Sequence, residues 1–433
     1  MESYTAPWAS SAARRRLAAV EAALPSDPAE ALERAAAAAH SHAQRLDEDT
    51  LQLNAGTNVP SPLVAALHES ALAAQPSMGY PGAKYQPGLE ALDVVEVTAA
   101  AAVARLMGAA FAEVRPTSAT LANLAVYTAL TDPGDTIAVL PDWAGGRHAE
   151  GAASVRGLRV ATLPYDAEAL DVDLDALDEF LGWEIPRLLV LGGSLMLFPH
   201  RLSAIADVVR GHGIPLLYDA SHVAGLIAEG RFQDPLREGA DLMTFSTYTS
   251  FGGPPGGVIV TNDAELAEQV ANAVHPVLLA NYDASRLVPL AAAALERDRS
   301  AGAYADQCIA NAQALAEALA EEGFDVVGGA DRGYTASHHV AIEIAGGGTP
   351  AASKLAESNL LASDIGVPAD PAGGVRFGTQ AITRQGFVED DMPAIAAACA
   401  GALLHDRDVR REVGELRRRR TGLRWCLTPE DLP

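Results

Sequence analysis

The sequence predicts an α/β protein with a mostly parallel sheet in a large domain and a smaller α/β domain toward the C-terminus. Of its 433 residues, 49% are apolar and only 5% are aromatic, so the chain can bury the cores of two or three domains. From about residue 51, segments with helical periodicity alternate with short segments that are apolar throughout. Strands of this kind are typical of a parallel sheet that helices cover on both faces.

The predicted elements follow in order along the chain. Residues 1–50 are expected to form a helical arm, in which 29–46 has the clearest helical pattern. In the large domain, predicted at 51–285, the clearest helices are 99–109 and 203–213. Its strands are 135–141, 187–194, 214–221, 240–247 and 257–263. Their apolar character predicts burial on both faces of the sheet.

A smaller C-terminal domain is predicted at 286–404. The long helical stretch 285–323 leads into it, and the strands 337–346 and 374–381 with a covering helix at 389–404 complete it. Two α/β domains leave a cleft between them, and ligands of open α/β sheets bind at the carboxyl ends of the strands. The functional site is therefore expected at these strand ends.

Charge and composition exclude some classes of function. The formal net charge of −25 opposes a nucleic-acid partner, because acidic side chains repel phosphates. One basic run, 417–420 in a tail at 405–433, is expected to be an exposed helix or tail that pairs with acidic side chains. No apolar run reaches the roughly 18 residues of a membrane span, and charges interrupt the N-terminal region, so a cytoplasmic location is expected.

The three cysteines, Cys308, Cys399 and Cys426, lie far apart in the sequence. They lack the spacing of metal ligands, so no metal site is predicted. We expect them to be reduced, structural thiols.

Polar residues follow two of the apolar segments. Ser118, Ala119 and Thr120 open a helix, where free N–H groups and small hydroxyls can hold a phosphate or simply cap the helix. Asp219 ends an apolar strand, and His222 follows it. A buried carboxylate there needs a cation or several donors, such as a protonated pyridine nitrogen. The alternative is that Asp219 caps the next segment and His222 packs in the core.

Two further segments place glycines or a charge in an apolar setting. The glycines of 252–257 permit close backbone approach, either for a tight turn or for a phosphate. Arg376 lies inside an apolar strand of the smaller domain, where a guanidinium requires a carboxylate. That carboxylate belongs either to a ligand or to a structural salt bridge.

Together these segments resemble the serine hydroxymethyltransferase family of fold-type I pyridoxal-phosphate enzymes, over roughly residues 51–404. The segments match the family in order and spacing as well as in content. They are 79-GYPGAKYQPG-88, 114-VRPTSATLANLAVY-127, 131-TDPGDTI-137, 216-LLYDASHVAGL-226, 252-GGPPGG-257 and 374-GVRFGTQAITRQGF-387. The resemblance implies the fold-type I architecture with its seven-stranded type of sheet, and a homodimer or homotetramer that acts on an amino acid.

The resemblance implies a cofactor role for five residues. Ser118 and Ala119, with Ser194 nearby, would hold the phosphate of pyridoxal phosphate. Asp219 would pair with the pyridine nitrogen and keep it protonated, which makes the ring an electron sink. His222 would contact the phenolic oxygen of the ring.

Five other residues receive substrate or subunit roles from the same resemblance. Arg376 would bind the α-carboxylate of the amino acid. Tyr80 and Lys84 lie in a loop that reaches the substrate in the family. Gly256 and Gly257 would approach the phosphate in the site of a neighbouring subunit.

The departures from the family fall at positions where the family has residues that hold the cofactor or take part in catalysis. Where the family has a histidine and then the lysine that carries the cofactor, this chain has Tyr248 and Thr249. Thr249 cannot form that covalent bond, and a hydroxyl is a poor base at neutral pH. The other departures are Met78 for a catalytic glutamate, Gln86 for a tyrosine, Ala144 (beside Trp143) for the histidine that stacks on the ring, and Gly56 for a serine of the substrate pocket. Ordinary folate-dependent serine–glycine interconversion is therefore not expected.

Three interpretations stay open. In the first, the protein binds pyridoxal phosphate, or pyridoxamine phosphate, noncovalently and performs aldol or retro-aldol chemistry at Cα–Cβ of an amino acid, while His222, Tyr248 or Thr249 moves protons. In the second, Lys84 replaces the missing lysine. In the third, the chain is a catalytically inactive homologue that serves as a partner subunit or binds a related ligand. An engineered Thr249 is a further alternative, which the accompanying departures argue against.

The first interpretation is the main prediction. Asp219 and Arg376 are costly to keep away from water unless a ligand pairs with them. A ligand with a pyridinium and a carboxylate satisfies both residues.

Overall fold

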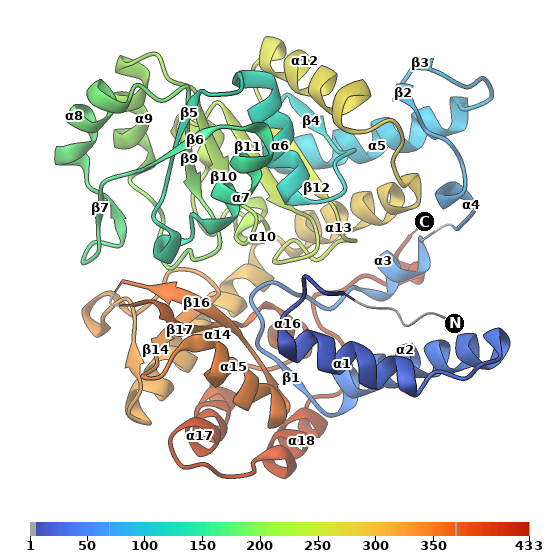
Figure 1. Cartoon of the computed structure of the whole chain (residues 1–433), viewed down its shortest axis with the longest axis vertical. Helices are drawn as coiled ribbons and strands as arrows, with labels where there is room; N and C mark the ends of the chain where they lie inside the picture. Colours follow the sequence, from blue (N-terminus) through green and yellow to red (C-terminus); the bar gives the residue numbers. More distant parts are fainter. Residues whose placement is uncertain (1–5, 69, 369, 433) are drawn as a thin grey trace. The chain divides into compact units, whose positions relative to one another are not determined.

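The computed structural model describes residues 6–68, 70–368 and 370–432 (Figure 1). They form two compact units, one that ends at Thr50 and one that starts at Leu51. The finer domain boundaries at 285 and 404 stay predictions.

The first unit consists of α1 (Ser11–Ala22) and α2 (Pro28–Glu48). The side chain of Ser10 caps α1, and the Asp27 carboxylate accepts hydrogen bonds from two N–H groups in the first turn of α2. The helix predicted at 29–46 corresponds to α2.

The second unit is built on a seven-stranded sheet with the order β4-β12-β11-β10-β9-β5-β6. Its strands are β4 (Phe111–Glu113), β5 (Thr136–Val139), β6 (Arg159–Thr162), β9 (Leu188–Gly192), β10 (Leu216–Asp219), β11 (Leu242–Ser246) and β12 (Gly257–Thr261). From β11 to β6 all neighbours are parallel, whereas β12 is antiparallel to both β11 and β4. The predicted α/β fold with a mostly parallel sheet is confirmed.

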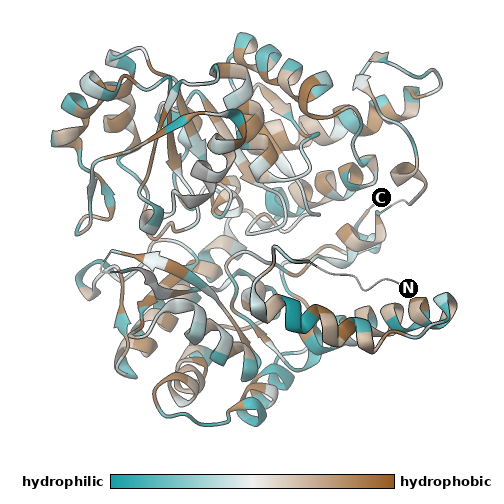
Figure 2. Ribbon diagram, in the orientation of Figure 1, coloured by the Kyte–Doolittle hydropathy of each residue, from teal (hydrophilic) through white to brown (hydrophobic). Residues whose placement is uncertain are grey.

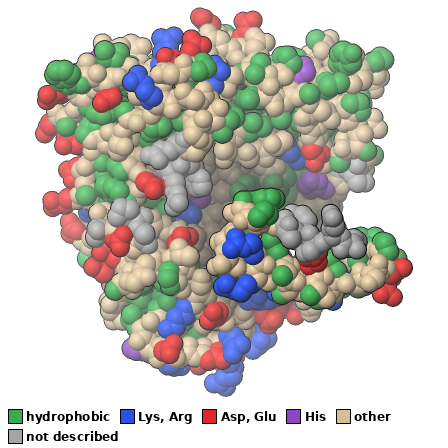
Figure 3. All heavy atoms as spheres, viewed as in Figure 1, with side chains coloured by type: hydrophobic (Ala, Val, Ile, Leu, Met, Phe, Trp, Pro, Cys, Tyr) green, Lys and Arg blue, Asp and Glu red, His purple; other side chains and the backbone are tan. Residues whose placement is uncertain are grey.

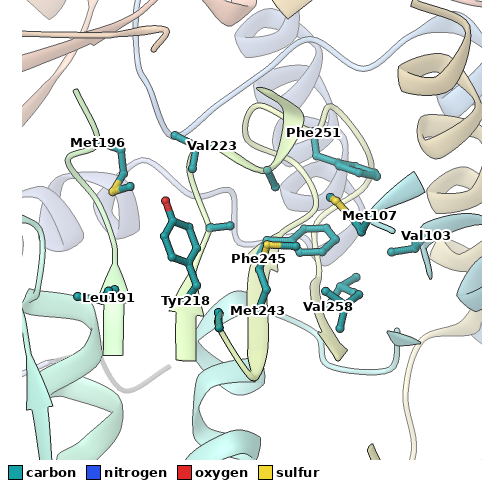
Figure 4. Close-up of a cluster of buried hydrophobic side chains, with 14 of the residues drawn as sticks. Val103, Met107, Leu191, Met196, Tyr218, Val223, Met243, Phe245, Phe251 and Val258 are labelled. Atoms are coloured by element: carbon teal, nitrogen blue, oxygen red, sulfur yellow. The ribbon is translucent and has the colours of Figure 1, made fainter. Parts of the chain in front are cut away.

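Helices cover both faces of this sheet. On one face lie α6 (Ala119–Leu130), α7 (Arg147–Arg156) and α12 (Ala264–Asn272); on the other lie α5 (Glu90–Leu106), α8 (Leu174–Glu184), α9 (Leu202–Gly211) and α13 (Leu287–Ser300). Because side chains alternate along a strand, Ile137 and Val139 pack in the core beneath α6, and Ala138 packs in the core beneath α5 on the opposite face. Figure 4 shows part of the core on the α5 face of the sheet, where the Phe245 and Phe251 rings have centroids 5.4 Å apart.

Every residue of β9, β10, β11 and β12 is buried. Figure 2 shows the middle strands of the sheet as largely hydrophobic, with hydrophilic residues on the outer helices. Burial on both faces explains why these strands are apolar throughout in the sequence.

The prediction of one long helical stretch at 285–323 is wrong in one respect. The stretch is broken into α13 and α14 (Ala303–Glu321), because Ala301 and Gly302 adopt left-handed φ values of 52° and 93°. The φ of Gly302 lies in the left-handed region, which a residue with a Cβ rarely adopts, so the turn favours glycine there. The helical periodicity continues across this turn, which hides it from a pattern analysis.

A second, antiparallel sheet has the order β13-β14-β17-β16. Its strands are β13 (Asp325–Val326), β14 (His339–Glu343), β16 (Ser363–Val367) and β17 (Asp370–Gly378), and α15 (Gly348–Glu357) and α17 (Met392–Leu403) pack with it. The strands predicted at 337–346 and 374–381 and the helix at 389–404 correspond to β14, β17 and α17. In addition, β1 (Leu51–Gln52) pairs in parallel with β15 (Leu360–Leu361).

The shorter elements of the second unit connect these layers. They are α3 (Pro62–Ala66), α4 (Ser70–Ala73), β2 (Gly79–Tyr80), β3 (Ala83–Lys84), β7 (Tyr165–Asp166), β8 (Asp171–Val172), α10 (Ala224–Ala228), α11 (Pro235–Glu238) and α16 (Gln380–Arg384). No helix within the described ranges is long and apolar enough to cross a membrane.

The basic run 417–420 falls at the end of α18 (Arg410–Arg419). Arg420 pairs with Asp391 at 2.8 Å, as predicted for a helix that meets acidic side chains. Arg417 departs from the predicted exposure, because it is buried and donates to the Arg420 carbonyl. Figure 3 shows basic side chains gathered at the lower end of the view, where Figure 1 places α18.

Candidate active site

A cavity of ≈ 280 Å³ lies at the carboxyl ends of β10 and β11. The start of α6 and the loop after β11 form its walls, and one side chain of β17 reaches it from the second sheet. Its lining residues are Gly56, Ser118, Ala119, Thr120, Asn123, Gly193, Ser194, Asp219, Ser221, His222, Ser246, Tyr248, Thr249 and Arg376. The cavity thus brings together eight of the predicted site residues: Ser118, Ala119, Ser194, Asp219, His222, Tyr248, Thr249 and Arg376.

Thr249 is buried in the wall of this cavity. Its hydroxyl donates to the backbone carbonyl of Ser221 over 2.5 Å. Tyr248, beside it, is 41% exposed. Positions 248 and 249 therefore present only hydroxyl groups to the cavity.

Neither of the chain's two lysines lies at the cavity. Lys84 Nζ lies 2.5 Å from Glu96 Oε2, and both side chains are only 5% exposed. The Tyr282 hydroxyl donates to the same carboxylate oxygen. Lys354 pairs with Asp406 at 2.8 Å on another part of the surface. Lys84 would have to leave a buried ion pair to serve as the cofactor lysine.

Tyr80 lies in the same hairpin as Lys84, formed by β2 and β3. It is 59% exposed and lines a separate cavity of ≈ 520 Å³ beside the edge strand β4. The Arg115 guanidinium lies 5.4 Å from the centre of its ring. The structure therefore does not bring Tyr80 or Lys84 to the cavity of its own chain.

Asp219 points into the cavity from the end of β10 and is 4% exposed. Asn123 Nδ2 donates to Asp219 Oδ2 over 2.7 Å, and the backbone N–H of Ser221 donates to Oδ1 over 2.9 Å. The Ser221 hydroxyl also donates to Oδ1. Throughout the described ranges no cation pairs with this carboxylate. Asp219 is therefore held by three donors and faces the cavity without a cationic partner among the described residues.

The start of α6 forms the opposite wall. The Ser118 hydroxyl accepts the Leu121 N–H over 3.1 Å, so Ser118 caps the helix while the first N–H groups of α6 face the cavity. A helix start of this kind attracts phosphate through its N–H groups and its dipole. The capping and the phosphate interpretations of Ser118 are therefore compatible.

Gly256 and Gly257 are constrained by contacts within this chain. A Cβ on Gly257 would lie 2.2 Å from the Ser118 carbonyl oxygen, and one on Gly256 would lie 2.2 Å from Arg286 Nη1. Glycine at 257 thus lets β12 approach the start of α6. The predicted approach of both glycines to a neighbouring subunit stays a prediction.

Arg376 is buried, with 6% exposed, and has no carboxylate partner among the described residues. One Nη donates to the Ser194 carbonyl, the other lies 3.3 Å from Ser363 Oγ, and Nε has no partner in the described part of the chain. Burial lowers the pKa of Arg376 to about 10, so the guanidinium stays charged at neutral pH. It can therefore bind a ligand carboxylate.

His222 lies beside Gly56, and its Nδ1 faces the Ala55 carbonyl oxygen at 3.3 Å. A carbonyl only accepts hydrogen bonds, so a neutral His222 carries its proton on Nδ1 and presents Nε2 as an acceptor. The His339 ring packs edge-on against His222, with centroids 5.4 Å apart.

His338 and His339 are buried at the start of β14. Burial lowers the pKa of His338 to about 3, and the charge of Arg376 adds to this effect. Burial also holds the pKa of His339 well below its usual range. Both imidazoles are therefore neutral, and Arg376 supplies the positive charge on this side of the cavity.

Trp143, beside the Ala144 departure, is absent from the lining of the cavity that holds Asp219. It packs edge-on against Tyr165, with centroids 5.1 Å apart, and lines a small separate cavity. Ala144 is buried in that same lining.

Sequence reasoning missed Asn123, Ser221 and Ser246. Asn123 follows Ala119 by one helical turn, so it shares the face of α6 that meets the cavity. Ser246 ends β11 with a buried hydroxyl that has no partner among the described residues. A polar residue on an otherwise apolar helix or strand was the available signal.

These residues fit pyridoxal phosphate. The start of α6 suits the phosphate, and the carboxylate of Asp219, which has donors but no cation, suits a protonated pyridine nitrogen. Ser246 Oγ and Arg376 Nε are buried polar atoms that the described chain leaves unpaired, as expected where a ligand completes the site.

The sheet order, with a cavity at the carboxyl ends of its parallel strands, defines the fold-type I class of pyridoxal-phosphate enzymes. Within that class, the chain belongs to the serine hydroxymethyltransferase family, whose sequence profile matches residues 32–399.

Its relatives include enzymes with different names. An alpha-methylserine aldolase of Variovorax paradoxus is 45% identical, with 87% of each chain covered. A serine hydroxymethyltransferase of Pyrobaculum calidifontis is 39% identical, covering 86% of this chain and 89% of that protein. The solved structure of L-threonine transaldolase from Pseudomonas fluorescens superposes with a TM-score of 0.85 at 26% identity, covering 92% of this chain and 95% of that one.

Proposed function

We propose that the protein binds pyridoxal phosphate, or pyridoxamine phosphate, noncovalently and makes or breaks the Cα–Cβ bond of an amino acid without folate. The observation that carries the proposal is the cavity itself, in which the Asp219 and Arg376 charges persist while Thr249 occupies the lysine position. The names alpha-methylserine aldolase and L-threonine transaldolase among the similar proteins support chemistry at this bond.

Binding would divide between two sides of the cavity. Ser118, Ala119 and Ser194 would hold the phosphate, and Asp219 would accept the proton of the pyridine nitrogen. When bound, the cofactor supplies an electron sink for the negative charge that forms at Cα. His222 would donate to, or accept from, the phenolic oxygen of the ring.

Arg376 would hold the substrate α-carboxylate. Its guanidinium has no competing carboxylate in the described chain, so a bidentate pair with a ligand costs no existing ion pair. Such a pair fixes the direction of the Cα bonds relative to the cofactor ring, which favours cleavage of one of them.

Proton transfer would fall to His222, Tyr248 or Thr249. Cleavage next to a β-hydroxyl requires a base for that O–H, and it releases an aldehyde. When His222 is neutral and Nδ1, which faces the Ala55 carbonyl, carries the proton, Nε2 is the basic atom of the ring. The Thr249 hydroxyl already donates to the Ser221 carbonyl, so His222 suits the role of base better.

Further parts of the proposal rest on the family. We propose a homodimer or homotetramer, in which Gly256 and Gly257 approach a neighbouring site. Tyr80 and Lys84 would contact substrate only across such an interface, because neither lines the cavity of its own chain.

An aldehyde-release assay tests this function. Purified protein supplied with pyridoxal phosphate should release formaldehyde from α-methylserine or serine, or acetaldehyde from threonine. Asp219→Ala should abolish cofactor binding and aldehyde release together. Unchanged binding in that variant would remove Asp219 from the pyridine site. Cofactor binding without aldehyde from any of the three substrates would refute the activity.

A second candidate is a catalytically inactive homologue that acts as a partner subunit or binds a related ligand. The burial of Thr249 at the lysine position, with both lysines ion-paired elsewhere, favours it. It predicts no cofactor spectrum and tight co-purification with an intact family member.

A further inference from the structure

A buried chain of hydrogen bonds runs behind Asp219. The Thr244 hydroxyl donates to Asn123 Oδ1 over 2.6 Å, and Asn123 Nδ2 donates to Asp219 Oδ2 over 2.7 Å. The three side chains are 0%, 2% and 4% exposed, in that order. They come from β11, α6 and β10, so three elements of the fold meet at one carboxylate.

The sheet register brings together the two residues at the ends of this hydrogen-bond chain. Asp219 and Thr244 are register partners on neighbouring parallel strands. Asn123 reaches them from α6, which covers that face of the sheet. A helix residue thereby bridges two strands through its amide.

The donor and acceptor roles in this hydrogen-bond chain follow from the chemistry of the three groups. A carboxylate only accepts, so the Asn123 amide must turn its NH₂ toward Asp219 and its oxygen toward Thr244. The Thr244 hydroxyl satisfies that buried oxygen. Without the hydroxyl, the oxygen would lose its partner in the described chain and the amide would lose the group that fixes its orientation.

Asp219 retains capacity for one more donor. Asn123 uses Oδ2, and the Ser221 N–H and hydroxyl use Oδ1, while each carboxylate oxygen can accept two hydrogen bonds. Asp219 also lines the cavity. The remaining acceptor position is therefore accessible to a donor that enters the cavity.

We infer that Asn123 and Thr244 are positioning residues that aim the Asp219 carboxylate at a ring N–H, so that the cavity selects a protonated nitrogen heterocycle over an isosteric benzene ring. This inference rests on the proposed function, because it assumes that a pyridine-bearing cofactor enters the cavity. To the proposed function it adds that the site selects a ring with a protonated nitrogen, and that Asn123 and Thr244 impose this selectivity.

The test compares pyridoxal phosphate with its 1-deaza analogue, in which C–H replaces the ring nitrogen. Thr244→Val removes the hydroxyl and keeps the shape of the side chain. We expect it to weaken the binding of pyridoxal phosphate about tenfold, or ~1.4 kcal/mol, and to leave the binding of the analogue within about twofold. Affinities come from titrations that follow the ligand absorption, which need no turnover.

Two matched variants complete the experiment. Thr244→Ser keeps the donor and should bind pyridoxal phosphate within about twofold of the wild type. Thr261→Val also removes a buried strand hydroxyl, which donates to the Asp241 carbonyl over 2.7 Å, away from Asp219. It should leave both affinities unchanged and shows the effect of losing such a hydroxyl elsewhere in the sheet.

Asn123→Ala gives an independent measurement if Thr244→Val folds poorly. It should also weaken pyridoxal phosphate binding selectively over the analogue. Equal losses for both ligands, or no loss in either variant, would overturn the inference. Failure of the wild type to bind pyridoxal phosphate at all would instead overturn the proposed function, and the inference with it.

Discussion

Lys84 and Arg376 are both buried cations of the second unit, but their surroundings differ. Lys84 has the Glu96 carboxylate at 2.5 Å and the Tyr282 ring centre at 5.7 Å. Arg376 has a backbone carbonyl, a serine hydroxyl and an unpaired Nε. A buried cation that stabilises the fold is expected to have a carboxylate partner, so the lack of an ion pair at Arg376 among the described residues is what the proposed ligand-binding role predicts.

The comparison distinguishes the hairpin that holds Lys84 from the cavity that Arg376 lines. It also predicts that Lys84, which is held in an ion pair with Glu96, does not act as the cofactor lysine. Four substitutions, given in order of decreasing expected effect, test these assignments of structural and ligand-binding residues.

Thr249→Lys should have the largest effect, because it supplies an amine in the cavity wall. With pyridoxal phosphate and borohydride, intact mass should show a fixed adduct on this variant and none on the wild type. The adduct should persist when Lys84→Met is added. A wild-type adduct on Lys84 would contradict the contrast drawn here.

Lys84→Met should destabilise the fold by ~3–5 kcal/mol, because it leaves the Glu96 carboxylate buried without a cation. Denaturant unfolding measures this change. Lys354→Met, which removes an exposed ion pair, is the control and should show no measurable change. A loss of cofactor affinity in Lys84→Met, at conditions where it is folded, would instead give Lys84 a binding role.

Arg376→Met should weaken amino-acid binding at least about tenfold, or ~1.4 kcal/mol. Because it removes a buried charge that has no carboxylate partner in the described chain, it should not destabilise the fold. Calorimetric titration and thermal unfolding measure the two effects. Unchanged substrate affinity would move the carboxylate site elsewhere.

The smallest effect concerns pH. The unfolded chain protonates His338 below about pH 6.5, but the folded chain does so only near pH 3, so stability should fall as pH falls through this interval. His338→Leu should reduce the loss between pH 7 and pH 5 by about 2 kcal/mol. An identical pH dependence in wild type and variant would show that His338 is not the responsible group. Asp171, whose pKa is lowered to about 2, adds its own loss only at more acidic pH, below about 4.

The sequence predicted the sheet and most of the cavity, because the relevant signals are local. Apolar strands that end in polar residues, such as Asp219, indicated both the fold and the site. The family resemblance then ordered these residues around one cofactor.

Other features depend on tertiary contacts that no local pattern contains. The Glu96 partner of Lys84 lies in another element, and Asn123 meets Thr244 only after α6 packs on the sheet. The break at Ala301 and Gly302 is a left-handed turn that the helical periodicity does not reveal. These contacts decide which charged or polar residues are structural and which face a ligand.

The pairing of β1 with β15 has a consequence for biosynthesis. Leu51 and Leu360 are parallel neighbours, and the Leu53 carbonyl accepts the Gly378 N–H over 2.7 Å. Farther along this segment, the Ala55 carbonyl faces His222 Nδ1, and Gly56 lines the cavity. On the ribosome, the segment that supplies this wall emerges early but waits for more than three hundred further residues before its partner exists. A chain that stops before β15 would lack this strand pairing, so we expect the cavity to be completed only late in synthesis.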